Sequence, residues 1–160
     1  MTNDNHRAKL QRWDTYFHTI CSAVASKSPC KSRQIGAILV RDNSIVATGF
    51  NGPPRNYPHC EGECNRRRLG YKSGEGLHLC PAAHAEVNCI SNAARLGVSV
   101  RGTTLYMNCI SPCKDCMIQI VNAGIIEIVV NSLDWYHDMS KAILLNSRVE
   151  IRKFYFGGEY

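Results

Sequence analysis

The second half of the chain alternates between helix-like and strand-like segments, and this alternation restricts the possible folds strongly. Apolar residues recur at helical spacing in three segments, and short apolar runs typical of buried strands lie between and after them. The helical segments are 83–96, 113–123 and 138–146, and the strand-like runs are 103–108, 125–130 and 149–154. Helices that connect apolar strands favour parallel pairing through right-handed crossovers. The pattern therefore predicts an α/β sheet.

The first half adds a helix and a hairpin to this pattern. Residues 8–27 have the apolar spacing of a one-sided helix. The apolar runs 35–40 and 44–48 follow, with Asp42 and Asn43 between them, and such a pair of residues is typical of a tight turn. The hairpin predicts an antiparallel edge. We expect a mixed five-stranded sheet with helices on both faces.

Length and composition predict one domain that spans residues 1–160. The chain has 160 residues, of which 44% are hydrophobic and 20% charged, as is usual for a globular protein. No apolar run reaches the ~20 residues that cross a bilayer, and the first residues are polar. We therefore expect a cytoplasmic protein, in the host cytosol if the source is viral. The net charge of +6 favours an anionic partner: a nucleotide, a nucleic acid or a membrane surface.

Two half-motifs carry the strongest chemical signal. His84-Ala-Glu86 stands at the start of one predicted helix, and Pro112-Cys113-Lys-Asp-Cys116 stands at the start of the next. Cysteines three residues apart on a helical turn face the same way. One histidine and two thiolates provide three zinc ligands and leave the fourth position open, as in catalytic zinc sites. The pattern is similar to that of zinc-dependent nucleobase deaminases, in which the glutamate is an acid/base and not a ligand.

A simpler interpretation of the same residues remains. His84 can be a hydrogen-bonded core histidine, and Cys113 and Cys116 can be a redox pair or merely buried. Because both half-motifs are present in the expected order, we favour the zinc hypothesis.

Nearly the whole chain resembles the deoxycytidylate (dCMP) deaminases of phage and bacterial type, in the cytidine/deoxycytidylate deaminase superfamily. The more family-specific segments are Gly49-Phe-Asn-Gly52 and Asp134-Trp-Tyr-His137. Other similar segments are 12–17, 34–40, 84–88, 105–113 and 122–126. The resemblance implies the three-layer α/β/α fold of the cytidine deaminases. It also implies a hydrolase acting on the C–N bond of a cyclic amidine, which converts dCMP to dUMP and ammonia in pyrimidine deoxynucleotide metabolism.

Regulation and site residues are also implied by the resemblance. It implies a homohexamer that dCTP activates and dTTP inhibits in the presence of Mg²⁺. His84, Cys113 and Cys116 would bind the catalytic zinc, and Glu86 would be the proton shuttle. The residues implied for the substrate are Asn51 at the sugar hydroxyl and Ser32, Arg33 and Tyr136 at the 5′-phosphate. The residues implied for the effector are Gly49, Phe50, Asn51, Gly52 and Asn88, and we add Arg66, which can meet a triphosphate.

Two of these residues have ordinary alternative roles. Arg33 can be a solvated surface charge. Asn51 precedes Gly52, and Asn-Gly is a common turn dipeptide.

The segment 51–80 is a loop too long to be ordered without help. Family members of this type have a second, structural zinc here, and the resemblance points to Cys30, Cys60, Cys64 and Cys80. His78 or His59 can replace one sulfur, and the alternative is four free cysteines around a flexible loop. Among the nine cysteines, Cys21, Cys89 and Cys109 then remain as core residues.

Other functions remain open at this point. The chain can be an editing deaminase that acts on tRNA or single-stranded DNA, a deaminase that also accepts dCTP, or a zinc-stabilised module without activity. Aromatic residues make up only 8% of the chain and no basic stripe is present, which argues against a nucleic-acid partner. We expect nucleotide substrates and no membrane partner.

Overall fold

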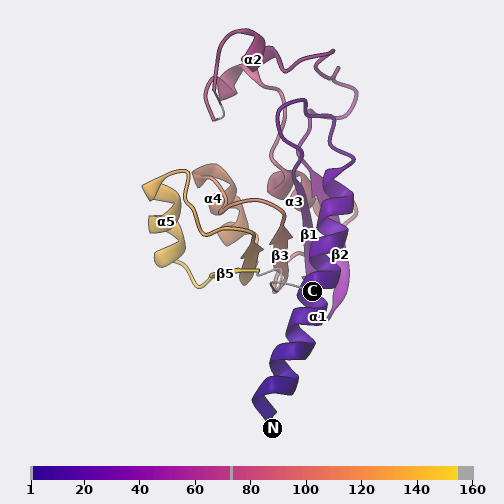
Figure 1. Cartoon of the computed structure of the whole chain (residues 1–160), viewed down its shortest axis with the longest axis vertical. Helices are drawn as coiled ribbons and strands as arrows, with labels where there is room; N and C mark the ends of the chain where they lie inside the picture. Colours follow the sequence, from indigo (N-terminus) through magenta and orange to yellow (C-terminus); the bar gives the residue numbers. More distant parts are fainter. Residues whose placement is uncertain (1, 73, 155–160) are drawn as a thin grey trace.

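A five-stranded sheet forms the centre of the computed structural model, which describes residues 2–72 and 74–154 (Figure 1). The strand order is β2-β1-β3-β4-β5. β1 pairs antiparallel with β2 and with β3, whereas β3, β4 and β5 are parallel. The strands are β1 (Gly36–Arg41), β2 (Ser44–Phe50), β3 (Thr104–Met107), β4 (Glu127–Val130) and β5 (Glu150–Lys153). The predicted mixed sheet and its hairpin edge are confirmed.

Helices cover both faces of this sheet. The helices are α1 (Thr2–Ala25), α2 (Asn65–Arg68), α3 (Ala85–Arg95), α4 (Lys114–Asn122) and α5 (Asp138–Leu145), with a 3₁₀ turn, η1, at Leu77–Leu79. Alternate residues of each central strand belong to two separate apolar clusters. Leu39, Leu105 and Ile128 pack with α3, α4 and α5, whereas Ile38 and Val129 pack with α1. The three-layer α/β/α fold is thus confirmed.

α1 is longer than the sequence pattern predicts. It begins at Thr2, and Figure 1 shows its N-terminal turns extending beyond the sheet. Leu10, in this extension, is 42% exposed, whereas Phe17, which lies over the sheet, is 1% exposed. The apolar spacing of α1 therefore marks a core face in its second half only.

An ion pair between a buried carboxylate and a partly buried arginine fastens α1 to the far edge of the sheet. The carboxylate of Asp14 accepts hydrogen bonds of 2.6 and 2.8 Å from the Arg152 guanidinium on β5 and one of 2.8 Å from the Tyr106 hydroxyl on β3. Arg152 also donates to Glu127 at 2.7 Å. These polar contacts cross the α1-facing layer, and the sequence patterns did not indicate them.

Gly49 brings β2 directly against the backbone of α3. A Cβ atom at this position would lie 2.3 Å from the Cys89 nitrogen and 2.7 Å from the Ala85 carbonyl oxygen. Backbone atoms cannot move aside as a flexible side chain can. The glycine therefore sets the distance between β2 and the helix that begins at the predicted zinc ligand His84.

Gly49→Ala is expected to lower the free energy of unfolding by about 1–3 kcal/mol, because the added methyl group separates β2 from α3. Chemical denaturation of zinc-loaded protein measures this change. Gly52→Ala is the matched control, since a Cβ there would meet its nearest neighbour, in Pro29, at 3.4 Å. Equal stability of the Gly49→Ala variant and the wild type would contradict the close-packing argument.

The predicted loop 51–80 extends over one end of the sheet (Figure 1). It contains α2 and η1, which sequence patterns did not predict because each has fewer than five residues.

Within the described residues, no helix has the length and hydropathy needed to cross a membrane.

Candidate metal centre and substrate cavity

The zinc motifs meet at the carboxyl end of β3, where two helices begin. His84 is the N-cap of α3, and Cys113 is the N-cap of α4, which follows β3 in the chain. Pro112 directly precedes that N-cap, and its carbonyl oxygen accepts a 2.7 Å hydrogen bond from the buried Ser140 hydroxyl of α5. Helix N-termini favour negative charge, so this placement suits thiolates.

The three predicted ligands lie within contact distance of one another. Nδ1 of His84 is 3.4 Å from Sγ of Cys113 and 3.3 Å from Sγ of Cys116. Among the described residues, these three provide the one group of possible ligand atoms that all lie within 4.8 Å of one another. In a tetrahedral site with Zn–S bonds of ~2.3 Å, neighbouring sulfurs are about 3.8 Å apart. The triad therefore has the spacing of a zinc site.

The electrostatics of the two thiols also fit a divalent cation. A hydrogen bond with the Cys116 thiol, assisted by the His84 ring, lowers the pKa of Cys113 to about 4. The same contact with Cys113, together with burial, raises the pKa of Cys116. Two adjacent thiolates repel each other, and a bound zinc ion would remove that repulsion. The chemistry of this donor set thus fits zinc.

Glu86 lies in the first turn of α3, beside the triad, with 4% of its surface exposed. Burial is the largest cause that raises the pKa of its carboxyl group. His84 and Cys113 also act on Glu86 electrostatically, in opposite directions. A buried carboxyl group next to an open zinc position is suited to transfer protons.

A cavity of about 400 Å³ opens at the triad. His84, Glu86 and Cys113 line this cavity. The residues predicted for the substrate line it too: Ser32, Arg33, Asn51 and Tyr136. The Arg33 guanidinium donates a 3.1 Å hydrogen bond to the Tyr136 hydroxyl. The structure therefore brings all four predicted substrate residues to one cavity.

Asn51 is held by the loop that carries Arg33. Its side-chain oxygen accepts hydrogen bonds from the Ser28 hydroxyl at 2.7 Å and the Ile35 N–H at 2.8 Å, and its amide donates to the Arg33 carbonyl oxygen at 2.8 Å. The residue is 8% exposed. These contacts differ from those of a simple Asn-Gly turn, because they fix the 28–35 loop at the mouth of the cavity.

The residues predicted for the effector fall into two places. The end of β2 and α3 hold one group: the Asn88 amide donates to the carbonyl oxygens of Phe50 at 2.8 Å and Gly52 at 3.4 Å. Gly49 and Asn51 belong to the same stretch of β2 and its continuation. Arg66 comes from a different element, α2, although it lines the large cavity together with Asn51 and the small cysteine pocket together with Gly52.

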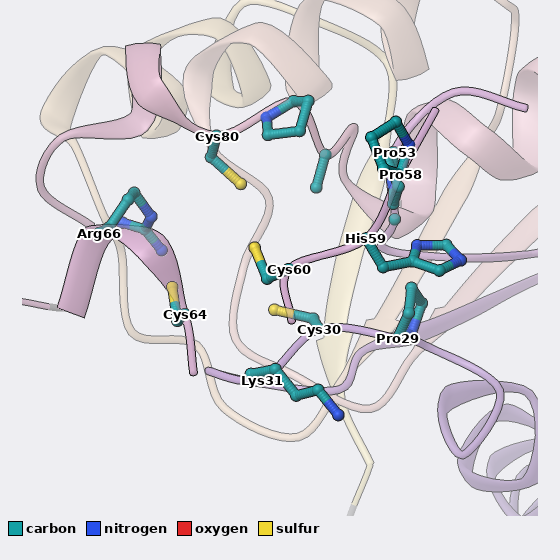
Figure 2. A pocket seen from close by; sticks show the side chains of 13 residues that line it. Pro29, Cys30, Lys31, Pro53, Pro58, His59, Cys60, Cys64, Arg66 and Cys80 are labelled. Atoms are coloured by element: carbon teal, nitrogen blue, oxygen red, sulfur yellow. The ribbon is translucent and has the colours of Figure 1, made fainter. Parts of the chain in front are cut away.

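The four loop cysteines line one small pocket of about 40 Å³. Figure 2 shows the sulfur atoms of Cys30, Cys60, Cys64 and Cys80 gathered in one region, whereas the ring of His59 points away from them. Cys64 is the N-cap of α2, and the backbone N–H of Arg67 is the largest cause that lowers the pKa of its thiol. Within the described part of the chain, no three of these sulfurs meet the 4.8 Å spacing of the His84, Cys113 and Cys116 triad. His78 is on η1 and does not line the pocket.

Two of the three remaining cysteines are core residues, as predicted. Cys21 and Cys89 are fully buried. Cys109 differs, because it is only partly buried and lines the catalytic cavity. It lies two residues after the end of β3, where its side chain packs against the core cluster on one side and lines the cavity on the other. Strand-length apolar patterns do not show where a strand stops.

Ser111 and His137 also line the cavity, and the sequence did not single them out as site residues. The Ser111 hydroxyl has no hydrogen-bond partner among the described residues, although the residue is fully buried. The position of Ser111 directly before the Pro112-Cys113 motif is the sequence feature that could have predicted it as a site residue.

An α/β/α sandwich with a His/Cys/Cys triad and a buried, non-ligating glutamate at two helix N-termini defines the class of zinc-dependent nucleobase deaminases. Residues 11–132 match the family model for the cytidine and deoxycytidylate deaminase zinc-binding region. The chain therefore belongs to the cytidine and deoxycytidylate deaminase family.

Individual relatives agree with this assignment. The deoxycytidylate deaminase of Saccharomyces cerevisiae is 35% identical over 98% of this chain and 50% of its own length, and that of Mycobacterium phage D29 is 35% identical over 73% of this chain and 92% of its own. The chain spans about half the length of the yeast relatives that it matches. Among solved structures, the dCMP deaminase of cyanophage S-TIM5 in complex with dCMP and dUMP superposes with a TM-score of 0.69 at 26% identity, covering 96% of this chain and 98% of that one.

Proposed function

We propose that this chain is a zinc-dependent deaminase that hydrolyses dCMP to dUMP and ammonia. The observation that carries the proposal is the shared cavity. His84, Glu86 and Cys113 line it together with Arg33 and Tyr136, whose side chains are joined by a hydrogen bond. A deaminase for a free nucleotide needs both a proton-transfer group and a phosphate site. The family membership and the similarity to dCMP deaminases support this substrate.

The residues of the chain divide the reaction between them. When bound by His84, Cys113 and Cys116, zinc supplies an activated water, since it lowers the pKa of a bound water toward ~7. Glu86 accepts a proton as the water attacks the carbon that bears the amino group, and it delivers that proton to the neighbouring ring nitrogen. The same carboxyl group then takes the proton of the hydroxyl added to that carbon and passes it to the amine. The C–N bond breaks, ammonia leaves, and the carbon becomes a carbonyl.

Substrate position follows from the cavity wall. The planar Arg33 guanidinium and the hydroxyls of Ser32 and Tyr136 suit a phosphate dianion. The second amide hydrogen of Asn51 remains available for a sugar hydroxyl, because the first is donated to the Arg33 carbonyl oxygen.

The test is a substrate panel with ammonia release as the measurement. The panel contains dCMP, dCTP, CMP, cytidine and a deoxycytidine-containing oligonucleotide, each with and without dCTP and Mg²⁺ as effector. We expect turnover of dCMP above all others. Turnover of the oligonucleotide alone would contradict the proposal and favour an editing deaminase, and no turnover of any substrate would favour a non-enzymatic zinc module.

A second zinc ion in the cysteine pocket is part of the proposal. The 40 Å³ pocket lined by four thiols supports it, with small loop movements that bring the sulfurs to about 3.8 Å spacing. Metal analysis is expected to find about two zinc ions per chain, and Cys60→Ser to lose about one of them. Cys21→Ser is the control for removing a thiol elsewhere. Retention of the full zinc content by Cys60→Ser would contradict the site.

Regulation and assembly complete the proposal. We propose that dCTP or dTTP binds with Mg²⁺ at the segment 49–52 and at Asn88 of α3. The Asn88 amide donates hydrogen bonds to the carbonyl oxygens of Phe50 and Gly52, which connects this segment to α3. We also propose that residues 1–160 are one domain and that six copies assemble. Sedimentation with and without dCTP tests the assembly.

A further inference from the structure

Arg66 connects the cysteine pocket to the catalytic cavity. It is the second residue of α2, directly after the N-cap Cys64 and Asn65, and Figure 2 shows its side chain beside Cys64. The residue lines both hollows: the small pocket with the four cysteines and the cavity with His84, Glu86 and Arg33. Arg66 therefore lines the same cavity as Arg33 and Tyr136. It comes from a different segment of the chain, the loop that carries the cysteines.

The hydrogen bonds of Arg66 leave donor capacity unused. Its Nη1 donates to the carbonyl oxygen of Glu75, which fixes the orientation of the guanidinium. Its Nε is buried and has no hydrogen-bond partner in the described part of the chain. A buried, charged donor without an acceptor is costly, and in a functional cavity it indicates an acceptor that arrives with a ligand.

The neighbouring arginines differ from Arg66. Arg67 and Arg68 belong to the same short helix, but they are exposed and line neither hollow. Only one of three consecutive arginines is thus turned toward the catalytic cavity. If the three arginines were only a solvated run of charges, all three side chains would be expected to be exposed.

The charges around the cavity favour an anion near Arg66. Among the described residues that line it, Arg33 and Arg66 are the two arginines, and Glu75 and Glu86 are the two carboxylates. One Glu75 oxygen already accepts a 2.8 Å hydrogen bond from the Lys72 N–H, and Glu86 is almost fully buried at the triad. The guanidinium groups therefore remain for an incoming acceptor.

We propose that Arg66 binds the phosphate group of the nucleotide substrate, as a second guanidinium beside Arg33. This inference rests on the proposed function and names a residue from the cysteine loop as a determinant of specificity. It assigns the loop a role in catalysis: the cysteine pocket positions α2, and α2 presents Arg66 to the substrate. It also replaces the effector role that the sequence suggested for this residue.

The test separates phosphate binding from loop structure. Zinc-loaded wild type, Arg66→Gln, Arg66→Lys and the control Arg68→Gln are compared for turnover of dCMP and deoxycytidine and for calorimetric binding of dUMP and deoxyuridine. Arg66→Gln is expected to raise the KM for dCMP and the Kd for dUMP by about 10–100-fold, the loss typical of a hydrogen bond to a charged group. Its kcat for dCMP, its turnover of deoxycytidine and its binding of deoxyuridine are expected to stay near wild type. Arg66→Lys is expected to fall between the two, and Arg68→Gln to match wild type.

Each other outcome overturns the inference in its own way. Equal losses on dCMP and deoxycytidine would show that Arg66 only supports the loop. An unchanged KM for dCMP with loss of dCTP activation would assign Arg66 to the effector. If the wild-type protein neither turns over dCMP nor binds dUMP, the proposed function is rejected, and this inference with it. If the wild type does both, the proposed function stands, and the Arg66 variants alone decide the role of Arg66.

Discussion

Glu86→Gln is expected to lower kcat for dCMP by about 10²–10⁴-fold while leaving the bound zinc in place. Glutamine has nearly the same shape, and Glu86 is not one of the three residues with metal-ligand spacing, so the site keeps its geometry. What the variant loses is the carboxyl group that we propose carries protons between water, ring nitrogen and amine. Steady-state kinetics and metal analysis on the same sample measure both quantities.

Glu150→Gln is the matched control, because that glutamate is exposed on β5, away from the cavity. Its activity is expected to equal wild type. A Glu86→Gln variant with near-normal activity would reject the proton-shuttle role, and one that loses zinc would show that Glu86 stabilises the metal site.

Arg152→Met is expected to reduce the free energy of unfolding by about 3 kcal/mol or more, since it leaves the buried Asp14 carboxylate without its cation. The Asp14 side chain is 7% exposed and Arg152 29% exposed, so water replaces the lost partner poorly. For a chain of this size the loss corresponds to a fall in Tm of about 6–12 °C. Calorimetry or denaturant unfolding of zinc-loaded protein gives the value.

Asp14→Asn combined with Arg152→Met is expected to recover part of this stability, because the pair is then neutral. Asp4→Asn, on the exposed first turn of α1, is the control and is expected to change stability little. If the double variant were no more stable than Arg152→Met, the loss would come from packing of the arginine stem and not from the unpaired charge.

The sheet could be predicted because its strands carry two readable patterns. A strand buried on both faces is a continuous apolar run, in which neighbours such as Ile38 and Leu39 serve opposite faces, and helices between the later strands favour parallel pairing. The turn at Asp42 and Asn43, both with positive φ, fixed the hairpin register as expected for such residues. Local physics therefore determined most of the architecture.

The metal centre could be predicted for a similar reason. The spacing of Cys113 and Cys116 is a property of one helical turn, and His84 and Glu86 belong to one short motif. Bringing the two motifs together requires only that α3 and α4 begin at the same end of the sheet, which the alternation of elements ensures.

Contacts between distant residues could not be predicted from such patterns. Asp14 and Arg152 are separated by 138 positions, and nothing near either residue marks it as half of a buried pair. The inward direction of Arg66, in contrast to Arg67 and Arg68, depends on how α2 is anchored at Cys64. The place of Cys109 at the cavity wall depends on where β3 ends, and element boundaries carry little sequence signal.

The cavity is assembled from two groups of residues with different support. His84, Glu86, Cys113 and Cys116 stand on two helices that the core cluster holds in place, whereas Ser32, Arg33, Arg66 and Tyr136 stand on connecting segments and a one-turn helix. A connecting segment tolerates substitution and changes in length far better than a packed helix. Substitutions in the connecting segments can thus alter which molecule is accepted while the reaction performed on it stays the same, so the range of substrates can evolve without rebuilding the catalytic centre.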